Sequence, residues 1–133
     1  MLLVETFTDC TRHKGVGLFA KEFIQQGTTY WVRNELFDRL FTPAMLTALN
    51  PIAIRYIEKY GFLEKSGNWY LCNDNARFSN HSNDPNSENH YDQFGIVQYC
   101  TAARDILKGE EILCDYTKVC MTCKDGVDFE PLN

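Results

Sequence analysis

Three short segments of the chain carry groups that could bind a ligand or act on it. The first is Lys14-Gly15-Val16-Gly17, in which two glycines flank one residue. Glycines at this spacing let a ligand approach the backbone closely and contact its amides and carbonyls. An ordinary hairpin turn also explains such a pair, and the third glycine of a dinucleotide-binding fingerprint is missing.

The second segment spans residues 76–86 and contains Asn80-His81 followed by the turn Pro85-Asn86. It places two side chains able to form hydrogen bonds beside a rigid corner. The third segment, residues 108–116, is a turn and a strand that end in Asp115-Tyr116. Taken alone, Tyr116 is explained equally well as a buried tyrosine with a satisfied hydroxyl.

In this order and spacing the three segments resemble the SET domain family of protein-lysine methyltransferases. The resemblance runs from about Gly15 to Tyr116, and residues 77–86 are its most specific part. It implies a curved β-fold with a C-terminal pseudoknot, in which Asn80-His81 lie beside Asp115-Tyr116. Methyl donor and target lysine would enter from opposite faces.

The resemblance also implies roles for individual residues. Tyr116 would be the catalytic residue, placed where the methyl donor and the lysine meet. Arg77 would lie near the cofactor, either in contact with it or bracing the loop. The residues implied to bind the cofactor S-adenosylmethionine are Lys14, Gly15, Val16, Gly17, Arg77, Asn80, His81 and Phe129, with Phe129 covering the adenine.

The chain departs from the family pattern where many members bind zinc. Asn83 stands at the position of a zinc-binding cysteine, and the tail offers only Cys120 and Cys123. Two thiols are half of the four ligands that a structural zinc requires. We therefore predict no metal site, with a zinc site completed by a distant Cys or His as the alternative.

A second departure concerns the expected lysine channel. Cys114 lies two residues before Tyr116, where the family carries Phe or Tyr. The smaller cysteine predicts room for higher degrees of lysine methylation. Tyr30 and Tyr70 are further candidates to line the channel, with packing in the core as the alternative.

The composition is that of one folded domain, residues 1–133, with residues 117–133 as a short tail. The chain has 133 residues, of which 44% are hydrophobic and 23% charged, and a net charge of −5. This length fits a single core. An acidic chain lacks the basic stripe that nucleic acid requires, so we expect a basic, lysine-containing protein or peptide as partner.

The six cysteines follow no secretory segment, and no apolar run is long enough to span a membrane. We therefore expect reduced thiols and an intracellular protein that is not bound to membranes. The sequence leaves open whether it is cytoplasmic or nuclear, and the resemblance to small stand-alone members leaves a homodimer open.

The pattern of elements predicts a mainly β fold with a short helical insertion. We expect strands over residues 2–7, 18–20, 28–32, 69–72, 96–102 and 112–114. Thr42-Pro43 and Asn50-Pro51 predict two helix starts, and Gly61 ends the second helix. Residues 73–90, rich in Asn, Asp and Ser, predict a long functional loop or a disordered segment.

The sequence therefore predicts an S-adenosylmethionine-dependent lysine methyltransferase acting on a protein, with a histone tail as one such substrate. The alternative is a catalytically inactive SET-like module that binds a basic peptide. Retention of Asn80, His81 and Tyr116 together disfavours the inactive module.

Overall fold

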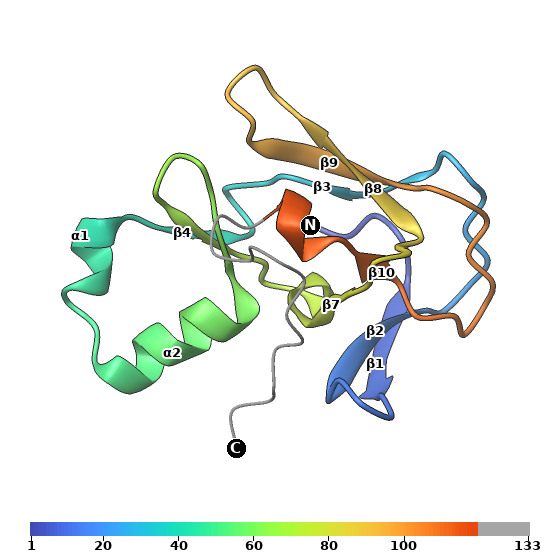
Figure 1. Ribbon diagram of the computed structural model, residues 1–133, viewed down its shortest axis with the longest axis horizontal. Helices are drawn as coiled ribbons and strands as arrows, with labels where there is room; N and C mark the ends of the chain where they lie inside the picture. Colours follow the sequence, from blue (N-terminus) through green and yellow to red (C-terminus); the bar gives the residue numbers. More distant parts are fainter. Residues whose placement is uncertain (120–133) are drawn as a thin grey trace.

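The computed structural model describes residues 1–119 and confirms a mainly β fold with a helical insertion (Figure 1). The strands are β1 (Thr6–Cys10), β2 (Val16–Ala20), β3 (Thr29–Val32), β4 (Arg39–Phe41), β5 (Phe62–Leu63), β6 (Trp69–Leu71), β7 (Asn80–His81), β8 (Ser87–Tyr91), β9 (Val97–Ala102) and β10 (Leu113–Cys114). The helices are α1 (Pro43–Leu46), α2 (Pro51–Tyr60) and two 3₁₀ turns, η1 (Asn75–Phe78) and η2 (Tyr116–Lys118).

Within residues 1–119 the strands form small sheets rather than one large one. The β1–β2 hairpin stands alone, β3–β9–β8 form one antiparallel sheet, and β4–β6–β5 form another. The two remaining strands, β7 and β10, pair in parallel near the middle of the molecule (Figure 1). The sheets therefore surround the segment that carries Asn80 and His81.

The helical insertion follows the local signals in the sequence. The side chains of Thr42 and Asn50 cap the N-termini of α1 and α2, and a proline occupies the first turn of each helix. Gly61 ends α2, as predicted, and Ile57 is the buried residue of that helix. The insertion lies on one side of the molecule with β4, β5 and β6 (Figure 1).

The core fills the space between β2, β3, β6 and β9. Its residues are Leu18, Ala20, Ile24, Tyr30, Trp31, Tyr70, Cys72, Val97, Cys100, Ala102, Ile106 and Ile112. Three of the chain's large aromatic side chains thus pack in the core. The rings of Trp31 and Tyr70 meet edge to face, with their centroids 5.9 Å apart.

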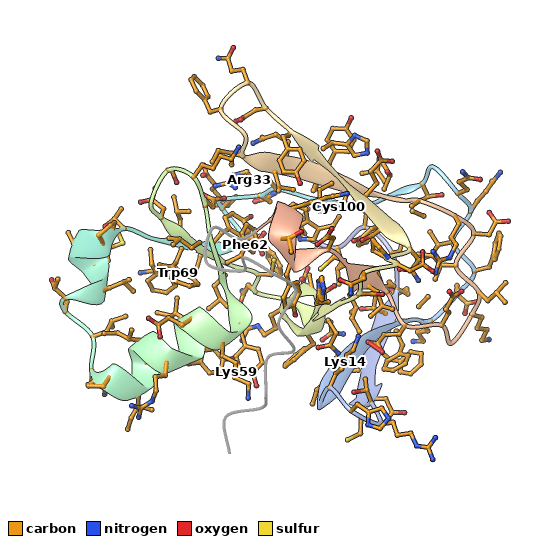
Figure 2. All side chains as sticks on the ribbon, viewed as in Figure 1. Lys14, Arg33, Lys59, Phe62, Trp69 and Cys100 are labelled. Carbon is orange, nitrogen blue, oxygen red and sulfur yellow. The ribbon has the colours of Figure 1, made fainter. Side chains whose placement is uncertain are left out.

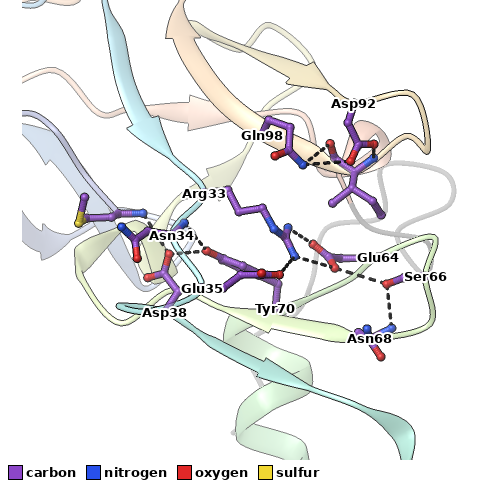
Figure 3. A network of polar contacts seen from close by, with 12 residues as sticks. Arg33, Asn34, Glu35, Asp38, Glu64, Ser66, Asn68, Tyr70, Asp92 and Gln98 are labelled. Carbon is purple, nitrogen blue, oxygen red and sulfur yellow. Dashed lines mark hydrogen bonds and ion pairs between the residues drawn. The ribbon is translucent and has the colours of Figure 1, made fainter.

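A buried polar network joins the end of β3 to the β4–β6–β5 sheet (Figure 3). Arg33 pairs with Glu64, and its guanidinium lies 4.4 Å from the centre of the Tyr70 ring. The hydroxyl of Tyr70 donates to Asp38 Oδ2 at 2.5 Å. Glu64 and Asp38 are almost fully buried. Their bonds to Arg33 and to the Tyr70 hydroxyl offset the free-energy cost of removing the two carboxylates from water.

Several sequence-based boundaries were wrong. The first strand is Thr6–Cys10 rather than residues 2–7, and Leu2 forms only an isolated bridge with Trp31. The predicted loop 73–90 contains η1, β7 and the start of β8. Polar composition misled there, because β8 gains its structure from pairing with β9, whatever its intrinsic preference for strands.

Candidate functional site

The site begins with the parallel pairing of β7 and β10. Asn80 pairs with Leu113 and His81 with Cys114, and Ser82 N donates to Cys114 O at 3.0 Å. Parallel strands must be joined by a long crossover, here strands β8 and β9 with their connections. This pairing brings Asn80-His81 beside Asp115-Tyr116, as the resemblance implied.

Asn86 holds β10 in this position. It is 1% exposed, and its amide donates from Nδ2 to Glu111 O at 2.7 Å and accepts at Oδ1 from Leu113 N at 2.8 Å. The neighbouring Ser87 donates to Leu113 O at 2.7 Å. The side-chain amide of Asn86 thus forms hydrogen bonds with the backbone of the β10 segment of the kind that a neighbouring strand would form. Sequence reasoning identified Asn86 only as a turn residue, because no local pattern reveals its distant partners.

The glycine turn lies against the same segment. Gly15 has a φ of +71°, and a Cβ placed there would meet nothing within 4 Å, so its backbone is open to close approach. At Gly17 a Cβ would lie 2.7 Å from Thr11 Cγ2 and 3.1 Å from Glu111 Oε2. Glycine at position 17 therefore makes room for the carboxylate of Glu111.

Two side chains connect this turn to β7, and one of them, Lys14, is labelled in Figure 2. Lys14 Nζ donates to His81 O at 2.5 Å. Asn80 Nδ2 donates to Val16 O at 3.1 Å and to Glu111 Oε2 at 3.2 Å. The three segments identified in the sequence therefore meet in one place, and Asn80 contacts both of the others.

The imidazole of His81 is a neutral hydrogen-bond acceptor toward Tyr116. The backbone N–H of Tyr116 donates to His81 Nδ1 at 3.0 Å, so the ring proton is on Nε2, which lies 3.0 Å from Asn83 Oδ1. Asp115 lies 3.8 Å from the same Nδ1 but forms no ion pair with a neutral ring. Its carboxylate caps η2 by accepting from Thr117 N at 3.0 Å.

The hydroxyl of Tyr116 is oriented by the loop that precedes β7. It donates to Ser79 O at 2.5 Å, and its ring lies 5.5 Å from the ring of His81. Because the phenol O–H already donates to a backbone carbonyl, its oxygen is left to accept a hydrogen bond from a further group, such as an amine. This arrangement fixes the direction of the hydroxyl and does not make Tyr116 a base.

Cys114 lies within a group of neutral polar side chains. Ser79 Oγ is 3.5 Å from its sulfur, and burial raises its pKa to about 11. Burial likewise raises the pKa of Cys100 to about 12, and that of Tyr30 well above its ordinary value. Tyr30 Oη lies within reach of Ser87 and Cys100. The side chains of Tyr30, Cys100 and Cys114 are therefore uncharged at neutral pH. Tyr30 is close enough to Cys114 for the two to interact electrostatically.

The structure places Tyr70 elsewhere. Its side chain is fully buried, and its hydroxyl accepts from Asn34 N at 3.1 Å as well as donating to Asp38. The expectation that Tyr70 lines a lysine channel is therefore replaced by the core role that was the alternative. Its hydroxyl stabilises the polar network of Figure 3 instead.

Arg77 is braced by its surroundings. Its Nε donates to Cys72 O at 3.0 Å and its Nη1 to the hydroxyl of Tyr56 at 2.5 Å. These bonds tie the loop before β7 to α2 and to the end of β6. They support the bracing role, and contact with a cofactor stays a prediction.

Phe129, Cys120 and Cys123 lie outside the described residues, as does all of the predicted tail except 117–119. Residues 1–119 contain no cluster of three or more His, Cys, Asp or Glu side chains arranged to hold a metal ion. None of the helices in this part of the chain has the length and apolar character needed to cross a membrane.

The sequence matches the model of a known protein family. A family model described as the SET domain matches residues 15–117, which is most of the chain. The chain belongs to the SET domain family. Apart from Lys14, the match contains all three segments that converge on β7.

Solved structures share the fold at low sequence identity. A candidate histone methyltransferase of Plasmodium falciparum is 20% identical, with a TM-score of 0.57, over 84% of this chain and 96% of that one. A humanized mutant of Polycomb Repressive Complex 2 from Chaetomium thermophilum, bound to the inhibitor GSK126, is 22% identical with a TM-score of 0.60. That match covers 85% of this chain but 15% of the other.

A search of curated proteins returned no significant match. At such low identities the solved structures show a shared fold alone.

The first prediction concerns Asn86. Asn86→Ala leaves Leu113 N and Glu111 O without their partner, and each unpaired buried group costs about 1–3 kcal/mol. We expect the free energy of unfolding, measured with urea, to fall by about 2–4 kcal/mol. Asn83→Ala, on the exposed part of the same loop, should change it by less than about 1 kcal/mol. Equal effects of the two substitutions would contradict the role of Asn86.

The second prediction concerns thiol reactivity. Only the thiolate is nucleophilic, so the raised pKa values of Cys114 and Cys100 keep both thiols unreactive below about pH 10. At pH 8 iodoacetamide should alkylate the exposed Cys10 and leave these two unmodified in the folded protein, as read by peptide mass spectrometry. Rapid alkylation of Cys114 at pH 8 would contradict the raised pKa of its thiol.

Proposed function

We propose that the chain is an S-adenosylmethionine-dependent protein-lysine N-methyltransferase. The observation that carries this proposal is the convergence of Tyr116, His81 and Asn80 with the glycine turn at the β7–β10 pairing. Membership of the SET domain family supports the same reaction. A basic segment of a protein, such as a histone tail, fits a chain with a net charge of −5.

The residues present fit the proposed cofactor. The open backbone at Gly15 admits close approach, and Asn80 and His81 lie next to it with polar groups in fixed orientations. Lys14, Gly15, Val16, Gly17, Asn80 and His81 would hold the group. When bound, S-adenosylmethionine supplies a methyl group on a positively charged sulfur.

The chain's own residues then orient the accepting amine. The amine must be neutral to attack, although a free lysine is protonated at pH 7 because its pKa is about 10.4. An environment of uncharged groups disfavours the ammonium form. The neutral side chains of Tyr30, Cys100 and Cys114 provide such an environment.

Tyr116 would align the amine. Its hydroxyl is directed by Ser79 O, and its backbone by His81 Nδ1, so two independent contacts set its position. Alignment of an attacking atom with its target accounts for several kcal/mol of a reaction barrier. In this proposal Tyr116 contributes through geometry, and the lysine ammonium releases its proton to water before the neutral amine attacks.

The third prediction tests this role. Tyr116→Phe should reduce methyl transfer by about 10²-fold or more, because the amine loses its alignment. Transfer of radiolabelled methyl to core histones measures the rate, and calorimetry with S-adenosylmethionine measures cofactor binding, which should persist. Tyr99→Phe, an exposed tyrosine on β9, is the matched control and should retain full activity.

Near-native turnover of Tyr116→Phe would refute the catalytic assignment. Cofactor binding by the wild type without transfer to any lysate protein would favour the inactive peptide-binding module. The absence of cofactor binding would exclude the proposed reaction.

The fourth prediction concerns the number of methyl groups added. If Cys114 lies beside the amine, its small side chain leaves space for an amine that already carries a methyl group. The wild type should form di- or trimethyllysine, and Cys114→Phe should shift the products toward monomethyllysine. Mass spectrometry of the modified peptide measures both. Monomethyllysine as the sole product of the wild type would overturn this interpretation.

A further inference from the structure

Glu111 presents a carboxylate to the glycine turn and to Asn80. It forms a bridge with Phe19 of β2, next to the bond from Ile112 N to Leu18 O at 2.8 Å. The carboxylate lies against Gly17, where a Cβ would be 3.2 Å from Glu111 Cδ. The side chain of Glu111, in the third segment, thus reaches both of the other segments.

The contacts of Asn80 determine which way its amide faces. An amide carries a donor, Nδ2, and an acceptor, Oδ1, on opposite sides of one carbon. Val16 O and the carboxylate of Glu111 can only accept hydrogen bonds, and both lie within 3.2 Å of the same end of Asn80. That end must therefore be Nδ2. The opposite end, Oδ1, is consequently an acceptor.

We propose that Glu111 is a positioning residue that holds the Asn80 amide so that Oδ1 accepts a hydrogen bond from the α-ammonium group of the cofactor. This inference rests on the proposed function and adds a specificity determinant to it. A carboxylate is a stronger acceptor than a carbonyl, so Glu111 contributes more to this orientation than Val16 O does. Its negative charge also favours a positively charged ligand group nearby.

The adjacent Glu110 supplies a matched comparison. Its carboxylate turns the other way, accepting from Leu107 N at 2.8 Å and approaching Asn86 Nδ2 at 3.4 Å. Consecutive side chains of an extended segment point to opposite sides, so Glu110 faces away from Asn80 while Glu111 faces toward it. Replacing either glutamate by glutamine changes the net charge equally.

The experiment compares two ligands that differ in the amino-acid portion. S-Adenosylhomocysteine carries the α-ammonium group, whereas methylthioadenosine has the same nucleoside without it. Calorimetry gives the dissociation constant of each ligand for the wild type, Glu111→Met, Glu111→Gln and Glu110→Gln. Methionine approximates the length of glutamate without an acceptor, and glutamine retains one amide oxygen.

We expect Glu111→Met to raise the dissociation constant of S-adenosylhomocysteine about tenfold, because a hydrogen bond to a charged group is lost. Glu111→Gln should fall between Glu111→Met and the wild type. Methylthioadenosine should bind all variants equally, which also shows that the site is folded. Glu110→Gln should leave both dissociation constants unchanged.

Two results would overturn the role of Glu111 while leaving the proposed function intact. One is undiminished binding of S-adenosylhomocysteine by Glu111→Met. The other is an equal loss for both ligands, which would mean that Glu111 supports the fold rather than the amide. If the wild type binds neither ligand, the proposed function fails and the role of Glu111 fails with it.

Discussion

The parallel pairing of β7 with β10 is the contact on which the rest of the site depends. It joins residues 33 positions apart, such as His81 and Cys114, and brings Asn80 and His81 beside Asp115 and Tyr116. Two strands of two residues each cannot hold together through their own ladder, since even a longer isolated pair is marginal in water. Asn86 and Ser87 supply the missing bonds from the side, so the site is stabilised by side chains as much as by backbone.

Two sets of the buried polar groups in residues 1–119 differ in charge. The charged set, Arg33, Glu64 and Asp38, is paired and buried beside Tyr70, where it joins β3 to the sheet of the insertion. The neutral set surrounds Cys114 and consists of hydroxyls and thiols whose pKa values burial has raised. In the proposed reaction, uncharged groups near the lysine amine would disfavour its protonated form, which cannot attack a methyl group.

Much of the local structure was predictable from the sequence, and the predictions that were wrong share one cause. The caps at Thr42 and Asn50 and the stop at Gly61 depend on neighbours in the chain, and all three were correct. β8 was missed because Ser87 and its polar neighbours become a strand only by pairing with β9. Tyr70 was misplaced for a similar reason, since its partner Asp38 lies 32 residues away and no spacing rule connects them.

By itself the sequence determined the residue types of the site, their order, and the family to which they point. The sequence alone shows the residues that carry the resemblance to the family. They are the glycines at positions 15 and 17, Asn80-His81 and Asp115-Tyr116. Tertiary structure alone decided which atoms meet: the Asn80 amide with Glu111, His81 Nδ1 with the backbone of Tyr116, and Cys114 with Ser79. The physical reason is that hydrogen-bond direction and side-chain burial depend on contacts between distant segments, and these form only when the chain has folded.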